Sequence, residues 1–295
     1  MFRSIFPRIV VAFTLTAAAF AAAPAGASEA GNPAAQRIVS VGGTITEILY
    51  ALGAHDRLVA VDSTSFYPSE ATSKPDVGYM RQLSAEGILA QKPDLILAED
   101  GSGPPPVLDI LRASGVPMVL VPTPATAEGI QDKIRNVGDA VGLAKEAEAL
   151  AAKTGADLER ITEEVAKLDV AKKRVLFVLS LSNGRIIASG TGTEAAAIID
   201  MAGGINAASG VSGYKPLTDE AVIAAKPDVI LAMARGDHKL TPEQVFAVPA
   251  LQGSPAAADH SLISMDGLFL LGFGPRTPEA VRALATQLYP GGIGG

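Results

Sequence analysis

The fold is decided by the stretch LSAEGILAQKPDLILA, residues 83–98, which returns as LTDEAVIAAKPDVILA at residues 217–232, a constant 134 positions later. Each copy has the form of a capped helix, a Lys-Pro-Asp turn and a buried apolar strand. A weaker echo pairs Thr46-Glu47 with Thr193-Glu194, and both pairs stand at the start of a helical segment. Since self-similarity at a fixed offset marks repeated structural units, the sequence predicts two similar α/β lobes.

Short apolar runs alternate with helical segments on both sides of this repeat. The strand-like runs lie at residues 37–41, 58–61, 95–98, 118–121 and 175–179. Continuous apolar runs suit parallel strands that are covered on both faces. Their alternation with helices predicts βαβ units, so we expect both lobes to be Rossmann-like.

One long stretch, from Ala127 to Leu168, has a different composition: it contains no proline and is rich in Ala, Glu, Lys and Leu. Its apolar residues recur at helical spacing and predict one long helix over about Lys145 to Leu168. We therefore expect an α/β fold in which an N-terminal lobe (28–137) and a C-terminal lobe (171–295) are joined by a linking helix (138–170). A cleft between two lobes is a natural site for a small ligand.

The first 27 residues have the features of a secretory signal peptide. Arg3 and Arg8 give a positive start, residues 9–23 are apolar and uncharged, and Ala25-Gly26-Ala27 has the small-x-small form of a cleavage site. The alternative is a retained membrane anchor, but an apolar stretch of about 15 residues is short for a bilayer. We expect cleavage after Ala27 and export to the periplasm.

The composition excludes several classes of function. The chain has 295 residues, no Cys, no Trp, 3 His and a formal net charge of -7. Without Cys there is no disulfide framework, no thiol nucleophile and no Cys-ligated metal site. An acidic balance without a basic cluster argues against nucleic acid as a partner.

A catalytic function finds weak support in the sequence. GTGTEA at residues 190–195 matches a dinucleotide-binding loop of the Gly-x-Gly-x-x-Ala type, but it lies in the second lobe and echoes a turn in the first. The Gly-x-Ser-x-Gly motif of serine hydrolases is missing from the sequence. We expect a binding protein and not an enzyme.

Three further strings resemble those of a known family. They are DVGYMRQLSAEG at residues 76–87, DSTS at 62–65 followed by Tyr67-Pro68, and GFGPR at 272–276. Together with two lobes, one long helix and a leader, they resemble the helical-backbone substrate-binding proteins of bacterial ABC importers, and all three strings are similar to those of the heme-binding members. This general resemblance covers about residues 36–290. It implies a periplasmic protein that captures heme and delivers it to an inner-membrane ABC transporter; a ferric siderophore or cobalamin is the alternative ligand.

The resemblance implies that Tyr79 is the axial ligand of the heme iron. Ferric iron is a hard Lewis acid that prefers an anionic oxygen donor, and Tyr is a known axial ligand. A free phenol has a pKa near 10, so a neighbouring cation would help to form the phenolate. Arg81 could supply that cation, because residues two apart in an extended segment face the same side. The ordinary alternative is a loop tyrosine beside a solvated arginine.

Other candidates for the ligand site are Arg276, Tyr67 and Tyr214. Arg276 follows a Gly-x-Gly-Pro turn and could pair with a heme propionate, or it could be a helix-start arginine packed against a neighbouring loop. The two tyrosines could contact the porphyrin or could simply be packing residues.

The three histidines are His55, His238 and His260. We expect His238, in a polar loop after a strand of the second lobe, to have the best access to the cleft as a second axial ligand. The sequence leaves open whether one or two hemes bind.

Glu86 and Glu220 occupy the same position of the two repeats. The resemblance implies that this pair docks onto basic pockets of the two-fold ABC permease. First-turn glutamates also stabilise helices through the helix dipole, and both roles are compatible. We expect a monomer whose partners are heme and the permease.

Overall fold

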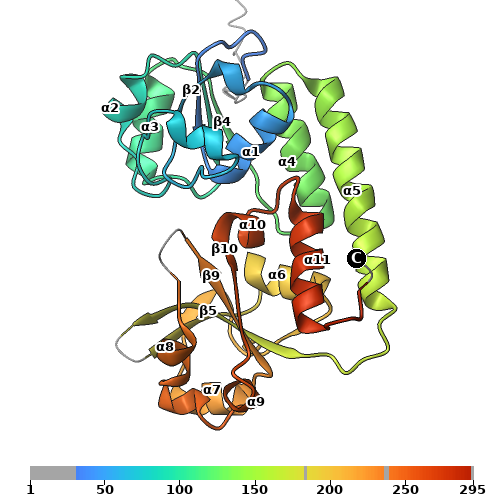
Figure 1. Ribbon diagram of the computed structural model, residues 1–295. Helices are drawn as coiled ribbons and strands as arrows, with labels where there is room; N and C mark the ends of the chain where they lie inside the picture. The colour runs from blue at the N-terminus through green and yellow to red at the C-terminus, as the bar shows by residue number, and fades with distance from the viewer. Residues whose placement is uncertain (1–30, 183–184, 236–238, 294–295) are drawn as a thin grey trace, which may run out of the picture.

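The computed structural model describes residues 31–182, 185–235 and 239–293 (Figure 1). The expected leader with its cleavage point after Ala27 lies outside these residues, and so does His238. The described chain forms two α/β lobes beside a pair of long helices, α4 (Ala127–Ala140) and α5 (Ala144–Ala166).

The N-terminal lobe contains a four-stranded parallel sheet in the order β2-β1-β3-β4. All four residues of β1 and four of the five residues of β3 are buried, as expected for apolar strands covered on both faces. In chain order the elements are β1 (Ile38–Val41), α1 (Gly43–Ala51), η1 (His55–Arg57), β2 (Leu58–Val61), η2 (Ser69–Ser73), α2 (Ala85–Leu89), β3 (Leu95–Glu99), α3 (Pro105–Ala113) and β4 (Met118–Val121).

The C-terminal lobe contains a mixed sheet in the order β10-β9-β5-β6-β8, with β7 paired to β5. Strands β5, β9 and β10 are parallel, whereas β6 runs antiparallel to β5 and β8. The two lobes are therefore similar only in part. The elements are β5 (Arg174–Ser182), β6 (Arg185–Ser189), α6 (Glu194–Met201), β7 (Ile205–Asn206), β8 (Tyr214–Pro216), α7 (Asp219–Ala225), β9 (Val229–Ala234), α8 (Pro242–Phe246), η3 (Pro249–Leu251), α9 (Pro255–Ala258), β10 (Leu262–Asp266), α10 (Gly267–Leu271) and α11 (Thr277–Leu288).

The repeated sequence adopts the same local structure in both lobes. Ser84 caps α2 by accepting a hydrogen bond from the Gly87 amide, and Thr218 caps α7 in the same way through Ala221. The lysine of each Lys-Pro-Asp turn is left-handed, with φ of 49° at Lys92 and 41° at Lys226, which ends the helix before the proline.

The aspartate of each turn then holds the neighbouring strand. Asp94 accepts hydrogen bonds from the amides of Gln36 and Arg37 at 2.9 and 2.8 Å, and Asp228 accepts one from the Arg174 amide at 2.7 Å. These bonds satisfy backbone donors where β1 and β5 begin. In the Lys-Pro-Asp signature, the lysine therefore ends the helix and the aspartate holds the start of the neighbouring strand.

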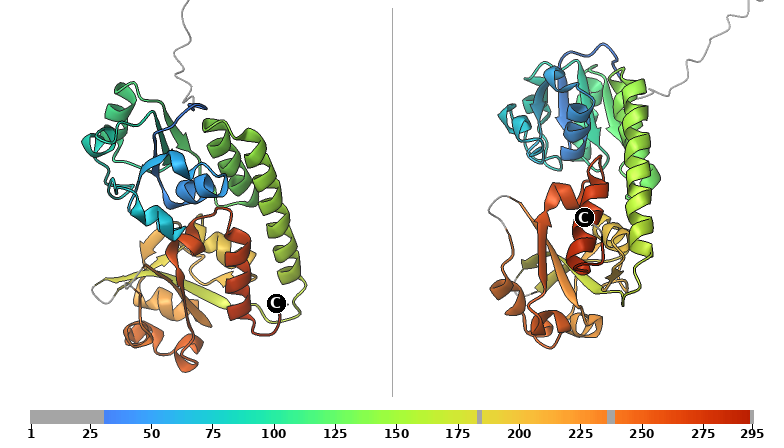
Figure 2. Two further views of the ribbon diagram at one scale, coloured as in Figure 1. Left: turned by 45° about the horizontal axis from the view of Figure 1, so that its top comes forward. Right: turned by 45° about the vertical axis from the view of Figure 1, so that its right-hand side comes forward.

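The lobes are joined on one side by α4 and α5, which pack closely against each other. Figure 2 shows α5 running alongside both lobes, and α5 also packs against α11 of the C-terminal lobe. The helix expected over Lys145 to Leu168 is thus confirmed as α5, and the α/β fold of two helix-linked lobes is confirmed with it. Within the described residues, none of the helices has the length and apolar composition needed to cross a bilayer.

Candidate functional site

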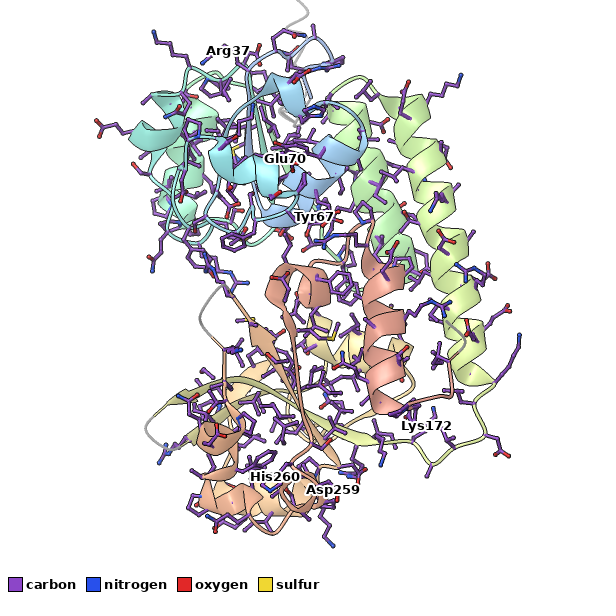
Figure 3. All side chains as sticks on the ribbon, viewed as in Figure 1. Arg37, Tyr67, Glu70, Lys172, Asp259 and His260 are labelled. Atoms are coloured by element: carbon purple, nitrogen blue, oxygen red, sulfur yellow. The ribbon has the colours of Figure 1, made fainter. Side chains whose placement is uncertain are left out.

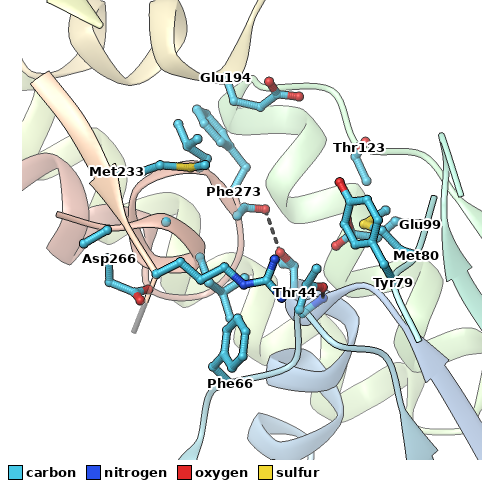
Figure 4. A pocket seen from close by; sticks show the side chains of 18 of the residues that line it. Thr44, Phe66, Tyr79, Met80, Glu99, Thr123, Glu194, Met233, Asp266 and Phe273 are labelled. Atoms are coloured by element: carbon cyan, nitrogen blue, oxygen red, sulfur yellow. Dashed lines mark hydrogen bonds between the residues drawn. The ribbon is translucent and has the colours of Figure 1, made fainter. Parts of the chain in front are cut away.

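A cavity of about 250 Å³ lies between the two lobes (Figure 4). On the N-terminal side its wall is formed where the parallel strands end: Thr44 follows β1, Phe66 follows β2 and Glu99 closes β3. On the C-terminal side the wall comes from the end of β9 and from the β10–α10 segment. Ligands of open α/β sheets bind at this carboxyl edge, because the loops there leave a crevice.

Tyr79 lines the cavity at its exposed rim. Its side chain is 37% exposed, and its phenol points toward the cavity in Figure 4. The preceding loop is held by a hydrogen bond from the Ser63 amide to the Gly78 carbonyl at 2.9 Å. Among the described residues the Tyr79 hydroxyl has no hydrogen-bond partner, so its oxygen is available to a ligand.

The backbone turns between Tyr79 and Gln82, whereas the same-side argument for Arg81 requires an extended segment. The Gln82 amide donates to the Tyr79 carbonyl at 2.7 Å, so Tyr79 opens a turn and the segment is not extended. The same-side argument for residues two apart is therefore wrong here. Met80 lines the cavity, whereas Arg81 is exposed and stands outside the lining.

Arg235 supplies a cation that the sequence interpretation missed as a site residue. It follows β9, lines the cavity and donates to the Ser63 carbonyl of the opposite lobe at 2.7 Å. Its guanidinium lies 4.9 Å from the centre of the Phe66 ring. The sequence feature that could have identified Arg235 is its position at the carboxyl end of a strand in the second repeat, the edge at which parallel sheets bind ligands.

The cavity floor is polar and closely packed. Lys133 of α4 is 1% exposed, and its ammonium donates to the Gly272 carbonyl at 2.9 Å. Thr44 donates to the same carbonyl at 2.9 Å. Beside them, Glu99 packs over Gly42, whose φ of 117° and missing Cβ make room for that carboxylate.

Burial governs the protonation of the floor. It raises the pKa of Glu99, which the Lys133 charge opposes, and it lowers the pKa of Lys133, which the carboxylates of Glu99, Glu194 and Glu47 oppose. The two groups therefore stabilise each other's charge. One oxygen of Glu99, Oε1, is buried and has no hydrogen-bond partner.

Tyr214 lies behind the cavity wall and is not part of its lining. Its hydroxyl donates to Oε2 of Glu194, a lining residue at the start of α6, at 3.1 Å. Burial and the Glu194 carboxylate raise the pKa of Tyr214 far above its usual range, so the hydroxyl stays protonated and keeps donating. Tyr214 thus positions Glu194.

Arg276 and Tyr67 meet at the junction of the lobes and also stand outside the cavity lining. The Arg276 guanidinium pairs with Glu47 of α1 at 2.8 Å and lies 3.5 Å from the centre of the Tyr67 ring. Figure 3 shows Tyr67 at the lower edge of the N-terminal lobe. A Cβ at Gly274 would approach the Thr44 methyl group to 2.5 Å, so the lobes touch closely here. We call this contact of Glu47, Tyr67 and Arg276 the interlobe clasp.

The two described histidines are remote from the cavity lining. His55 stacks on Tyr50 with ring centres 4.9 Å apart, and His260 packs edge-on against Phe246 near the far end of the C-terminal lobe (Figure 3).

Glu86 and Glu220 are exposed in the first turns of α2 and α7. The two helices lie in different lobes and away from α5 (Figure 1). Hydrogen bonds from its own backbone amide and from Thr218 lower the pKa of Glu220, so this residue is held as a carboxylate.

Comparison with solved structures shows strong similarity to heme-binding proteins. The periplasmic heme-binding protein RhuT from Roseiflexus sp. RS-1 is 38% identical, with a TM-score of 0.82 over 86% of this chain and 98% of that one. The periplasmic heme-binding protein BhuT, solved with two hemes, is 36% identical, with a TM-score of 0.81 over 85% and 97%.

Sequence comparison adds a relative with a different ligand. The vitamin B12-binding protein of Vibrio campbellii is 31% identical over 75% of this chain and 79% of its own length. The model of the periplasmic binding protein family matches residues 38–267, most of the chain. The fold, the interlobe cavity and this match agree, and the chain belongs to the periplasmic binding protein family.

Proposed function

We propose that this protein captures heme in the interlobe cavity and delivers it to an inner-membrane ABC importer. The observation that carries the proposal is Tyr79, whose unpartnered phenol faces the cavity from the rim. A phenolate oxygen is a suitable donor for ferric iron, which a porphyrin already holds through its four nitrogens. The protein then has to supply only one strong ligand.

The cavity walls suit a flat, largely apolar ligand. Met80 lies on the N-terminal side, and Met233, Leu268 and Leu271 lie on the C-terminal side. Thioether and leucine side chains adapt to the faces of a planar ring. A volume of about 250 Å³ is small for a drug-sized pocket, so heme would project from the rim or separate the lobes slightly.

The solved relatives support heme as the ligand. RhuT and BhuT, both described as periplasmic heme-binding proteins, align with nearly their whole length to this chain. BhuT was solved with two hemes, so the hemin titration of this protein should also determine how many hemes bind.

Cobalamin is the second candidate. The similarity to the vitamin B12-binding protein of Vibrio campbellii favours it. A polyanionic ferric siderophore is less suited, since Glu99, Glu194 and Asp266 outnumber Lys133 and Arg235 in the lining.

Export and delivery complete the proposal. The leader would be removed after Ala27, and the mature protein would act as a monomer in the periplasm. Glu86 and Glu220, one exposed on each lobe, would contact the two halves of the permease.

The test is a titration with hemin followed by absorption spectroscopy, with Tyr79→Phe as the variant. The substitution keeps the ring and removes the donor oxygen. We expect hemin affinity to fall about a hundredfold, on the order of 2.7 kcal/mol, and the charge-transfer bands of phenolate-ligated ferric heme to disappear.

Tyr50→Phe is the matched control, because Tyr50 lies on α1 outside the cavity lining. It should leave spectrum and affinity unchanged. An unaltered spectrum in Tyr79→Phe would contradict the ligand assignment. Binding of cyanocobalamin in preference to hemin by the unmodified protein would favour the second candidate.

A further inference from the structure

The charged side chains of the cavity differ between its rim and its floor. Arg235 and Asp266 are exposed at the rim, whereas Lys133 is buried at the floor and Glu194 is half-buried beside it. Glu99, the last residue of β3, shares the floor with Lys133. Heme also has two unlike edges, one with two anionic propionates and one with apolar substituents. The question is therefore which edge of the heme lies at the floor of the cavity and which at the rim.

The floor carries no surplus positive charge among the described residues. Its cation, Lys133, donates to the Gly272 carbonyl and lies among the carboxylates of Glu99, Glu194 and Glu47. In the part of the chain that the structure describes, Oε1 of Glu99 is buried without a hydrogen-bond partner, and the Glu194 carboxylate accepts a hydrogen bond from Tyr214. A propionate placed there would lose its hydration and compete with Glu99, Glu194 and Glu47 for a single ammonium, which is unfavourable in a buried site.

The rim offers the opposite environment. Arg235 is exposed, and the acceptor of its guanidinium is the neutral Ser63 carbonyl at 2.7 Å. A propionate would be a stronger acceptor for the same guanidinium, because hydrogen bonds between charged groups are stronger than those to a neutral carbonyl. The one rim carboxylate in the lining, Asp266, already accepts from the Phe269 amide at 2.9 Å as the cap of α10.

We propose that Glu99 and Glu194 determine ligand orientation by rejecting carboxylate groups from the floor, so that heme enters with its apolar edge first and its propionates at the rim beside Arg235. The inference rests on the proposed heme function. It makes these two glutamates specificity-determining residues that act on the ligand directly.

The experiment compares hemin with hemin dimethyl ester, whose propionates are neutral, in equilibrium titrations. The proteins are the wild type, Arg235→Gln, the floor variant Glu99→Gln/Glu194→Gln, and the triple variant. We expect Arg235→Gln to weaken hemin binding about tenfold in the wild type, the size of a charge-assisted hydrogen bond, and to leave the diester within about threefold. In the floor variant, Arg235→Gln should lower hemin affinity by less than about threefold, because the propionates can then lie either at the floor or at the rim.

Two results would overturn the orientation. One is an equal loss from Arg235→Gln in both backgrounds. The other is a floor variant that binds hemin about tenfold more tightly while Arg235→Gln has no effect, since propionates would then already face the floor. Failure of wild-type protein to bind either porphyrin would contradict the proposed function itself and is thus a distinguishable outcome.

Two control variants remove charges outside the cavity lining: Arg185→Gln on β6 and Glu159→Gln on α5, both exposed. Neither should alter the ratio of hemin to diester affinity. If Glu99→Gln impairs folding, Glu194→Gln alone should still reduce the effect of Arg235→Gln on hemin. The comparison of the two porphyrins in the wild type needs no substitution.

Discussion

Arg276 holds the two lobes together through the interlobe clasp. Its guanidinium pairs with Glu47, which is 6% exposed, and lies over the Tyr67 ring. Removal of one partner leaves a largely buried charge without its counterpart, and this is a costly change. We expect Glu47→Gln to lower the free energy of unfolding by about 2–3 kcal/mol, measured by urea denaturation.

The matched control is an exposed ion pair, Arg135–Glu148, in which both side chains are at least 35% exposed. Glu148→Gln should change stability little, because water already screens that pair. Equal losses of stability in Glu47→Gln and Glu148→Gln would show that the interlobe clasp stabilises the fold no more than an exposed ion pair does. Glu47→Gln combined with Arg276→Gln should recover part of the loss, as expected for coupled residues.

The residues of the site differ in how far sequence alone could identify them. Tyr79, which lines the cavity, could be identified because it lies within a short continuous motif, residues 76–87. The clasp joins Glu47 to Arg276 across 229 positions, and Lys133 reaches Gly272 across 139, so neither contact leaves a local pattern. The turn at Tyr79–Gln82 was missed because the same letters are compatible with extended backbone.

At the scale of elements, the two Lys-Pro-Asp turns have the same sequence but make different numbers of hydrogen bonds to the neighbouring strand. Asp94 accepts two amide hydrogen bonds and Asp228 accepts one. We therefore expect Asp94→Ala to lower the free energy of unfolding by about 1–2 kcal/mol and Asp228→Ala by roughly half as much. Urea denaturation measures both, and hydrogen exchange of the Gln36 and Arg37 amides reports the local loss.

Asp109→Ala serves as the control for these variants, since Asp109 is 76% exposed on α3 and anchors no strand. Protection of the Arg37 amide that survives in Asp94→Ala would contradict the anchoring role. The repeated helix, turn and strand, and the long helix α5, could be predicted because apolar runs and caps are local patterns. The antiparallel β5–β6–β8 part of the second sheet was not predicted, since strand direction depends on pairing and not on composition.

At the scale of the whole molecule, α5 and the clasp connect the lobes at separate places. Because two such connections restrict hinge closure, we expect the proposed capture of ligand to involve small changes at the cavity rim and no wide swing of the lobes. We expect the separation between the lobes to change little on ligand binding. If Glu86 and Glu220 dock onto the permease as proposed, the spacing between them would then be a feature that the permease recognises.

This geometry leads to a test that separates delivery from capture. Charge reversal at both sites, Glu86→Lys with Glu220→Lys, should leave hemin affinity and the ferric spectrum unchanged, because both residues lie outside the cavity lining. Transport into vesicles that contain the permease should be lost, since two docking charges would be inverted. Glu243→Lys is the matched control: Glu243 is an exposed first-turn glutamate of α8, and its pKa is lowered by its own amide and by Thr241, as that of Glu220 is by Thr218. If Glu243→Lys abolishes transport as fully as the double reversal, the loss is caused by altered helix N-termini or by net charge, and the docking role is contradicted. Transport that persists in the double variant would also contradict it.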